Sequence, residues 1–248
     1  MPQLKKPKRV TKAVLSKLKQ VTTPTLTTQL LKQHGLRNVS LHNVLPIDPS
    51  VGRFAGPAYT LRYVPLREDL LPQQYLDYPQ NLMTEVVEEI PAGSVMVIDA
   101  NGCKDVGTLG GNILMRLKLR KIEAAVTDGG MRDIPEVRGL GMAVCATAFA
   151  APPSFTKLML VDNQCVVTCV GVPIFPGDII VGDAEGTVAI PAEFAESVAD
   201  AGLAQDHIEG WVNRRLAKGQ PMPGLYPPSN KMRAEYEKWV EKGEPDEV

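Results

Sequence analysis

The chain has 248 residues, which corresponds to one large domain or to one domain with an appendage. Its composition, 44% hydrophobic and 22% charged, is that of a globular protein and excludes disordered and collagen-like classes. The 27 basic and 28 acidic residues nearly cancel, so a protein built to neutralise a nucleic-acid backbone is not expected. Gly and Pro, at 21 residues each, predict an α/β protein with many turns between short elements.

Residues 1–22 form a basic N-terminal segment. Its cations are Lys5, Lys6, Lys8, Arg9, Lys12, Lys17 and Lys19. The segment lacks the apolar core and small-residue cleavage site of a secretory signal. Val10, Val14, Leu15 and Leu18 recur at helical spacing, so the segment is predicted to be a helix with a solvated basic face. No apolar run reaches the ~18 residues that a membrane-spanning helix needs, so no membrane span is predicted.

The cysteines and histidines do not form a metal motif. Because no export signal is present, Cys103, Cys145, Cys165 and Cys169 are predicted to be reduced thiols in a cytoplasmic protein. Residues 165–172 are rich in β-branched side chains and predict one strand with Cys165 and Cys169 on the same face. The three histidines, His34, His42 and His207, show none of the spacings of a zinc site.

The first half of the chain predicts alternating helices and strands. A capping Thr, an early Pro and a terminal Gly predict a helix over residues 23–35, and alternating residues predict a strand over 58–64. A helix over 82–90 leads into an apolar strand over 94–99. Residues 112–121 fit either element, but their Leu, Met, Lys and Arg content favours a helix. With a buried strand at 124–128, this order predicts a parallel strand pair joined by a helix.

The second half predicts shorter strands and two helices. Strands are expected at 141–146, 165–172, 178–181 and 187–190, the last three antiparallel or barrel-like. A long helix should run from Pro191 to about Leu216, ended by Gly219. A Pro-rich link and an amphipathic helix near 231–242 follow. The predicted organisation is a basic segment (1–22), a main domain (23–219) and a C-terminal extension (220–248).

The most informative motif is Thr127-Asp128-Gly129-Gly130-Met131-Arg132-Asp133. It leaves a buried strand at its carboxyl end, where α/β sheets bind ligands. Arg132 offers a planar fork suited to a carboxylate, and Asp133 offers hard oxygens suited to Mg²⁺ or Mn²⁺. The motif thus fits an anionic oxo acid chelated to a metal. The alternative is an ordinary pair of exposed loop residues.

A second motif, Leu109-Gly110-Gly111-Asn112-Ile113-Leu114, lies about twenty residues earlier. It is a glycine-rich loop that enters a helix, and the free N–H groups of a helix N-terminus can hold an anion. A simple turn explains the two glycines equally well.

These motifs, together with the Pro176-Gly177-Asp178 and Gly182-Asp183-x-Glu185-Gly186 signals, resemble the RraA-like family. That family includes the divalent-metal aldolases of 4-hydroxy-4-methyl-2-oxoglutarate and 4-carboxy-4-hydroxy-2-oxoadipate. The resemblance covers residues 56–219, and the basic segment and C-terminal tail resemble a longer subgroup called regulators of ribonuclease activity. It implies a three-layer β/β/α swivelling-domain fold with helical extensions, assembled as a homotrimer or hexamer with sites between subunits.

The resemblance also implies roles for individual residues. Arg132 would bind the oxo-acid end of the substrate, and Asp133 would coordinate the metal. Glu209 matches an acidic residue that the adjoining subunit supplies. Backbone donors for the pyruvate carboxylate would come from Gly111, Asn112, Ile113 and Leu114.

Asn112 departs from the family pattern. It corresponds best to an acidic residue that holds metal-bound water, and an amide can hydrogen-bond this water but cannot accept its proton. The chain is therefore predicted to be a Mg²⁺- or Mn²⁺-dependent lyase that forms pyruvate enolate by aldol cleavage, by oxaloacetate decarboxylation, or by both. A regulator that binds a ribonuclease without catalysis is the alternative, and an enzyme acting on another small oxo or hydroxy acid fits the same residues.

Overall fold

The computed structural model describes residues 9–69 and 82–245. Residues 1–8 of the predicted basic segment and 246–248 of the predicted extension lie outside the described residues. The helices are α1 (Lys12–Leu18), α2 (Thr23–His34), α3 (Leu82–Glu89), α4 (Gly111–Leu119), α5 (Ile134–Arg138), α6 (Ala195–Ala217) and α7 (Asn230–Glu241). The strands are β1 (Leu45–Pro46), β2 (Phe54–Pro65), β3 (Val95–Asp99), β4 (Ala124–Thr127), β5 (Gly130–Met131), β6 (Ala143–Ala146), β7 (Ala148–Phe149), β8 (Leu158–Asn163), β9 (Val167–Cys169), β10 (Val172–Ile174), β11 (Ile179–Asp183) and β12 (Gly186–Ile190).

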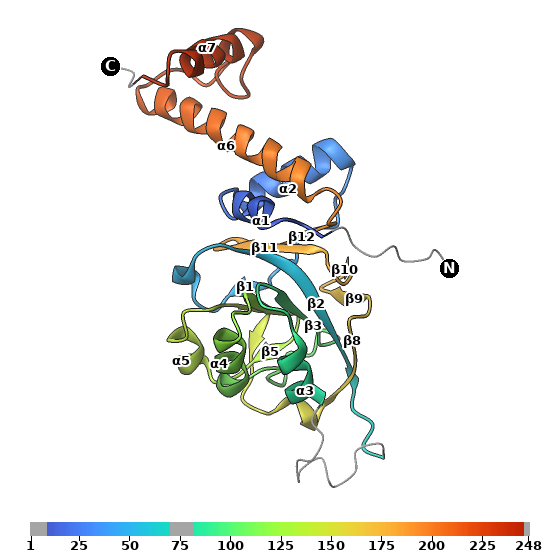
Figure 1. Cartoon of the computed structure of the whole chain (residues 1–248). Coiled ribbons are helices and arrows are strands. Elements are labelled where there is room, and N and C mark those ends of the chain that lie inside the picture. Colours follow the sequence, from blue (N-terminus) through green and yellow to red (C-terminus); the bar gives the residue numbers. More distant parts are fainter. Residues whose placement is uncertain (1–8, 70–81, 246–248) are drawn as a thin grey trace.

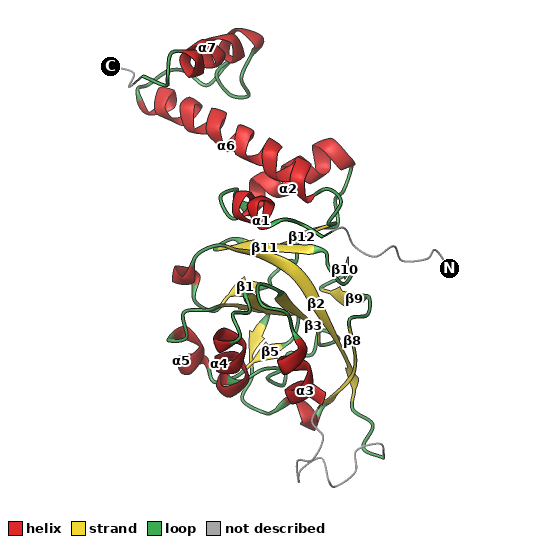
Figure 2. Ribbon diagram, viewed as in Figure 1, coloured by secondary structure: helices red, strands yellow, loops and turns green. Residues whose placement is uncertain are grey.

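A mixed sheet forms the centre of the molecule, in the order β1-β6-β4-β3-β2-β11-β12, with β8 also paired to β2. Strands β2, β3, β4 and β6 are parallel neighbours, whereas β11 and β12 are antiparallel. Helices lie on both sides of the strands (Figures 1 and 2). The α/β class and the parallel β3–β4 pair joined by a helix are confirmed.

The long strand β2 belongs to two parts of the sheet. Its first residues pair with β11, and residues from Ala58 onward pair with β3. Where Phe54 lies opposite Gly182, a Cβ on the glycine would stand 2.2 Å from the Phe54 ring. Glycine is therefore required at 182, because the aromatic ring covers it.

Side chains of β3 alternate between two apolar cores, because successive residues of a strand point to opposite faces. Met96 and Ile98 belong to the core that contains Leu114 and Leu117 of α4. Val95 and Val97 belong to the core on the other face, which includes residues of β9 and β10. Burial on both faces explains the uninterrupted apolar run that predicted this strand.

The N-terminal helices pack on α6 and on the β11–β12 hairpin. Helix α2 has no acidic residue in its first turn, but two distant carboxylates take its place. Asp183 accepts hydrogen bonds from the Thr23 N–H and hydroxyl, both at 2.8 Å, and Asp206 accepts one from the Thr25 hydroxyl at 2.7 Å. Negative charge at a helix N-terminus is stabilising, so these bonds fasten α2 to β11 and α6.

The second half of α6 and helix α7 form a separate apolar cluster. Trp211 and Trp239 are buried in it, and the guanidinium groups of Arg215 and Arg214 lie 4.2 and 4.8 Å from their ring centroids. Figure 1 shows α6 leading away from the sheet toward α7. In the described part of the chain, no helix combines the length and the apolar character needed to cross a membrane.

Most predicted elements agree with the structure to within a few residues, and helix α4 confirms the helical interpretation of residues 112–121. The single strand predicted over 165–172 is wrong. Val170 and Gly171 have positive φ angles of 46° and 82°, which reverse the chain and produce the β9–β10 hairpin. Cys169 is buried in β9, whereas Cys165 precedes that strand, and all four cysteines are free. Strand β8 was not predicted.

The Pro176-Gly177-Asp178 turn predicts a pH dependence of stability. Burial raises the pKa of Asp178 to about 6. A hydrogen bond from the Phe175 N–H to the carboxylate acts in the opposite direction but does not cancel this shift. The folded state thus holds the proton more tightly than the unfolded state, and stability falls as the pH rises from about 4 to about 6. Asp178→Asn should therefore be more stable above pH 6 by up to about 3 kcal/mol, because one pKa unit is worth ~1.4 kcal/mol.

Urea denaturation of both proteins between pH 4 and 7.5 measures this difference. Asp105→Asn is the control, because its ion pair with Lys157 lowers the pKa of Asp105 and no gain above pH 6 is expected. Equal stabilities of wild type and Asp178→Asn across the whole range would contradict the prediction.

Candidate active site

The candidate site forms where β4 ends and the chain turns through β5 into α5. Asp133, the residue before α5, has φ 58° and ψ 43°, in the left-handed region. Non-glycine residues seldom adopt this conformation, although Asp and Asn tolerate it better than most. The turn directs the Asp133 side chain to the start of α4, which lies beside it.

The two predicted motifs meet through this carboxylate. Asp133 Oδ2 accepts a hydrogen bond from the Gly111 N–H at 2.9 Å. Its Oδ1 lies 3.3 Å from Nε of Arg132, and the Arg132 N–H donates to the Leu109 carbonyl. The Arg132 and Asp133 side chains are 37% and 38% exposed, so both are held in place yet remain accessible to a ligand.

Glycines in the loop before α4 allow this close approach. A Cβ at Gly107 would lie 2.7 Å from the Arg132 Cβ, and one at Gly110 would lie 2.5 Å from Asp133 Oδ2. Both distances are shorter than real contacts, so a side chain at either position would displace the pair. The glycines therefore have a specific packing role beyond that of a simple turn.

Two carboxylates at the ends of neighbouring strands hold the surrounding loops. Asp99 accepts hydrogen bonds from the Asn101 and Thr168 N–H groups, and Asp128 accepts them from Ala100 and Gly102. Burial raises the pKa of Asp128 above its ordinary value and the nearby Asp99 charge adds to the shift, while the backbone N–H groups of Ala100, Gly102 and Val170 oppose it.

The first turn of α4 offers fewer backbone donors than the sequence predicts. The Gly111 N–H is bonded to Asp133, and the Leu114 N–H donates to the Gly110 carbonyl at 3.1 Å. Asn112 and Ile113 precede the first residue whose N–H bonds within the helix, so their N–H groups are the orphan donors of this end. Asn112 is exposed, and Ile113 is half-buried.

Glu209 does not join the other predicted residues within one chain. It lies on α6, which leaves the sheet on the side opposite α4 and α5 (Figure 1). There its carboxylate accepts hydrogen bonds from Gln205 at 2.6 Å and from the Tyr226 hydroxyl at 3.4 Å. Its participation in a site shared with a neighbouring subunit stays a prediction.

The residues present fit a metal that is bound mainly through water and substrate. No group of three or more His, Cys, Asp or Glu side chains suited to a metal occurs among residues 9–69 and 82–245. Asp133 offers an accessible carboxylate that the backbone fixes in place beside Arg132. Mg²⁺ often binds proteins through one or two carboxylates and keeps several waters, so a single fixed Asp is compatible with it.

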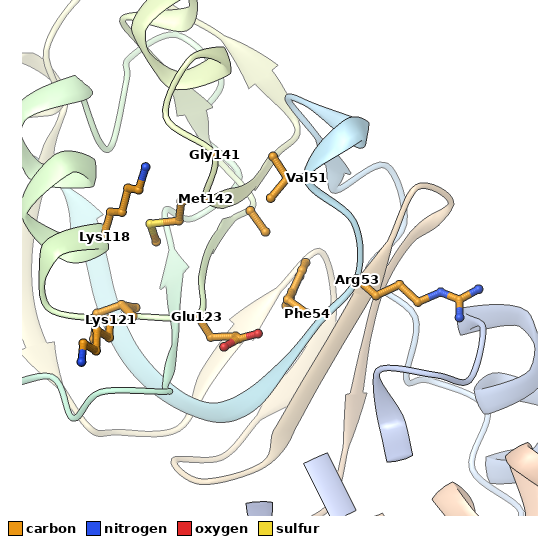
Figure 3. A pocket seen from close by; sticks show the side chains of 10 residues that line it. Val51, Arg53, Phe54, Lys118, Lys121, Glu123, Gly141 and Met142 are labelled. Carbon is orange, nitrogen blue, oxygen red and sulfur yellow. The ribbon is translucent and has the colours of Figure 1, made fainter. Parts of the chain in front are cut away.

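A cavity of about 300 Å³ lies at the other end of the strands, near Glu123, Met142 and Phe54 (Figure 3). Glu123 forms an ion pair with Lys19, and the Arg53 side chain points away from Met142 toward the carbonyl of Gln20. None of the predicted site residues lines this cavity.

Sequence reasoning missed two features of the site, the packing of Gly107 on Arg132 and the loop contacts of Asp128. The contacts of Asp128 could have been suspected from the sequence, because Asp128 is a carboxylate at the end of an apolar strand and is followed by two glycines. The packing of Gly107 on Arg132 could not have been suspected, since this contact joins residues that are 25 positions apart in the sequence.

Comparison with known proteins identifies the relatives of this chain. A family model described as RraA-like, Aldolase/RraA, matches residues 23–189. The 4-hydroxy-4-methyl-2-oxoglutarate aldolase of Thermus thermophilus is 32% identical over 140 residues, which are 56% of this chain and 76% of that protein. The crystal structure of Streptomyces coelicolor RraAS2, named as an unusual member of the RNase ES inhibitor RraA protein family, has a TM-score of 0.73 and 28% identity. The matched region covers 83% of this chain and 98% of the Streptomyces coelicolor chain.

Protein DlpA of Legionella pneumophila is 29% identical over 183 residues. This match spans 73% of the present chain but only 28% of DlpA. The chain therefore corresponds to a small part of that relative.

The glycine contacts yield a matched pair of variants. Gly110→Ala puts a methyl group against Asp133 Oδ2, whereas Gly111→Ala meets the Glu136 Cβ at an ordinary 3.4 Å. If Asp133 holds a divalent cation, Gly110→Ala should lower Mn²⁺ affinity about 10-fold, in the range that perturbing the support of a metal ligand costs. Gly111→Ala should leave the affinity unchanged, because Ala keeps the N–H and favours the helix. Electron paramagnetic resonance titration measures both, and equal affinities of the two variants would contradict the role of Gly110.

Proposed function

Because this chain belongs to the RraA-like family, we propose that it is a divalent-metal-dependent lyase acting on a small α-oxo acid, with pyruvate enolate as the intermediate. The observation that carries the proposal is the Arg132–Asp133 pair, fixed through Asp133 to the N-terminus of α4. Aldol cleavage of 4-hydroxy-4-methyl-2-oxoglutarate and decarboxylation of oxaloacetate give the same enolate, so both belong to the proposal.

The chain's own groups have distinct roles in the proposed reaction. The Arg132 guanidinium binds the oxo-acid end and neutralises the charge that develops as the C3–C4 bond breaks. The substrate carboxylate lies against the α4 N-terminus, where the Asn112 and Ile113 N–H groups remain as donors. Asp133 would hold Mg²⁺ or Mn²⁺. When bound, that cation supplies Lewis-acid stabilisation of the oxo-acid oxygens.

Proton transfer is the step for which the proposed site offers the fewest suitable groups within one chain. The Asn112 amide donates and accepts hydrogen bonds but does not take up a proton at neutral pH. Glu209 of an adjoining subunit is the proposed second group near the reacting water, in a homotrimer or hexamer. Decarboxylation releases CO₂ without needing a base, so it is expected to be the faster activity of the two.

A regulator of ribonuclease activity is the second candidate, because the related Streptomyces coelicolor structure is named for that role. Such a regulator would act by protein contacts and would need neither Arg132 nor a metal. A cytoplasmic location is proposed for either function, consistent with the four free cysteines.

Metal removal tests the proposal first. Pyruvate release from oxaloacetate should require Mg²⁺ or Mn²⁺, because Asp133 supplies hard oxygen ligands and no thiolate or imidazole cluster lies beside it among the described residues. Activity should disappear in excess EDTA and return when Mn²⁺ is added. Full activity in the chelator would contradict the proposal.

Arg132→Lys tests the guanidinium. The ammonium keeps the charge but loses the two-pronged donor geometry, so kcat/KM for oxaloacetate should fall about 100-fold, as for removal of a well-placed donor. The matched control is Arg116→Lys, which alters an exposed arginine paired with Glu88 and should leave kcat/KM unchanged. Equal losses in both variants would remove Arg132 from the site.

Asn112→Asp tests the proton-transfer step. A carboxylate here should raise the rate of aldol cleavage relative to decarboxylation, because general acid–base assistance is typically worth ~10²-fold or more. Repulsion between this carboxylate and Asp133 opposes the gain by raising a pKa. The ratio of the two rates in a pyruvate-coupled assay gives the result. An unchanged or lower ratio, with a monomeric mass in solution, would contradict both the role of position 112 and the shared site.

A further inference from the structure

We propose that Asp128 is a positioning residue for this site, because its buried carboxylate fixes the loop 100–107 that supports Arg132. The inference rests on the proposed function, since Arg132 is the group being positioned. Asp128 itself does not touch the substrate in this proposal.

The carboxylate of Asp128 is almost entirely enclosed, with 4% of the residue exposed. Oδ1 accepts the Ala100 N–H at 2.6 Å, and Oδ2 accepts the Gly102 N–H at 3.1 Å. On its other side, the Asp128 carbonyl accepts a hydrogen bond from the Thr147 hydroxyl at 2.7 Å. Asp128 therefore joins the start of the loop to the end of β4 and to the segment after β6.

The loop carries this restraint to Arg132. The Gly130 N–H donates to the Cys103 carbonyl at 3.1 Å, and the Thr108 N–H donates to the Gly130 carbonyl at 2.9 Å. Between these two bonds lies Gly107, where an added Cβ would stand 2.7 Å from the Arg132 Cβ. Loop 100–107 thus packs directly against the Arg132 side chain. Displacement of the loop would leave empty space beside that side chain.

The positioning role requires a carboxylate at position 128. An ionised carboxylate is an acceptor at both oxygens, which matches two converging N–H groups. An asparagine of the same shape would keep one acceptor and turn its NH₂ toward the second N–H, so one bond would be replaced by a donor–donor contact. Asp128→Asn should therefore release one end of the loop with little change in volume.

Asp183 provides a matched control. It is also buried at the end of a strand, β11, and accepts two backbone N–H groups, from Thr23 at 2.8 Å and Glu185 at 2.9 Å. Neither bond involves loop 100–107, because Thr23 begins α2 and Glu185 lies between β11 and β12. Asp183→Asn should cost similar stability without moving Arg132.

Kinetics of oxaloacetate turnover give the first test. Asp128→Asn should lower kcat/KM about 10- to 100-fold, the loss expected when a reacting group is misplaced by about 1 Å. Asp183→Asn should stay within about threefold of wild type, as an independent distant change does. In an Arg132→Lys background, Asp128→Asn should cost little more, because the group it positions is already altered. Full additivity of the two losses would overturn the proposal.

Hydrogen–deuterium exchange tests the same link without using activity. Asp128→Asn should speed amide exchange in both 100–111 and 129–133, whereas Asp183→Asn should speed it in 22–26 and 184–186. If the wild type turns over no oxo acid but this pattern is found, the proposed function fails while the positioning contact stands. If the wild type is active and exchange in 129–133 is unchanged by Asp128→Asn, the inference is overturned.

Thr147→Val replaces Asp128→Asn should that variant not fold. Valine keeps the shape of threonine and removes the hydroxyl that holds the Asp128 carbonyl. It should lower kcat/KM in the same direction, with a loss that largely disappears in the Arg132→Lys background. Unchanged kcat/KM and unchanged exchange in 129–133 would overturn the inference.

Discussion

The candidate site depends on one hydrogen bond, from the Gly111 N–H to Asp133 Oδ2 at 2.9 Å. It joins the start of α4 to the turn before α5, and these are the segments that carry the two sequence motifs. The bond is available because Asp133 adopts a left-handed conformation, which points its carboxylate back toward α4. Such a conformation costs of order 1 kcal/mol or more, so the surrounding contacts must hold it. Gly107 and Gly110 leave the space in which those contacts form.

This arrangement explains why the candidate site lies at the end of β4. Burial of β3 and β4 on both faces fixes the strands, so the first residues of their exit loops are fixed as well. Asp99 and Asp128 then hold those loops through backbone N–H groups, which any sequence supplies. The positions of Arg132 and Asp133 are thereby set by backbone contacts more than by side-chain packing.

The parts of the structure that could be predicted are those whose signals are local. The α2 caps, the apolar run of β3 and the helix-forming residues of α4 each lie within one short segment, so their elements were predicted. The β9–β10 hairpin was not, because Val170 adopts a positive φ that β-branched residues disfavour, and only Gly171 hints at the turn. The motifs identified Arg132 and Asp133, but their contacts with Gly110 and Gly111 cross more than twenty residues and have no local signature.

The separation of Glu209 from Arg132 has a consequence for assembly. The first half of helix α6 packs on α1, α2 and the β11–β12 hairpin, and this shared core holds the helix on the side of the sheet opposite α4 of its own chain. A site that contains both residues must therefore combine two chains. In that case activity depends on protein concentration through subunit association, while the bonds that fix Arg132 and Asp133 are complete within each chain. Dilution would then remove Glu209 from the site and leave the oxo-acid and metal groups in place, so aldol cleavage would be lost before decarboxylation.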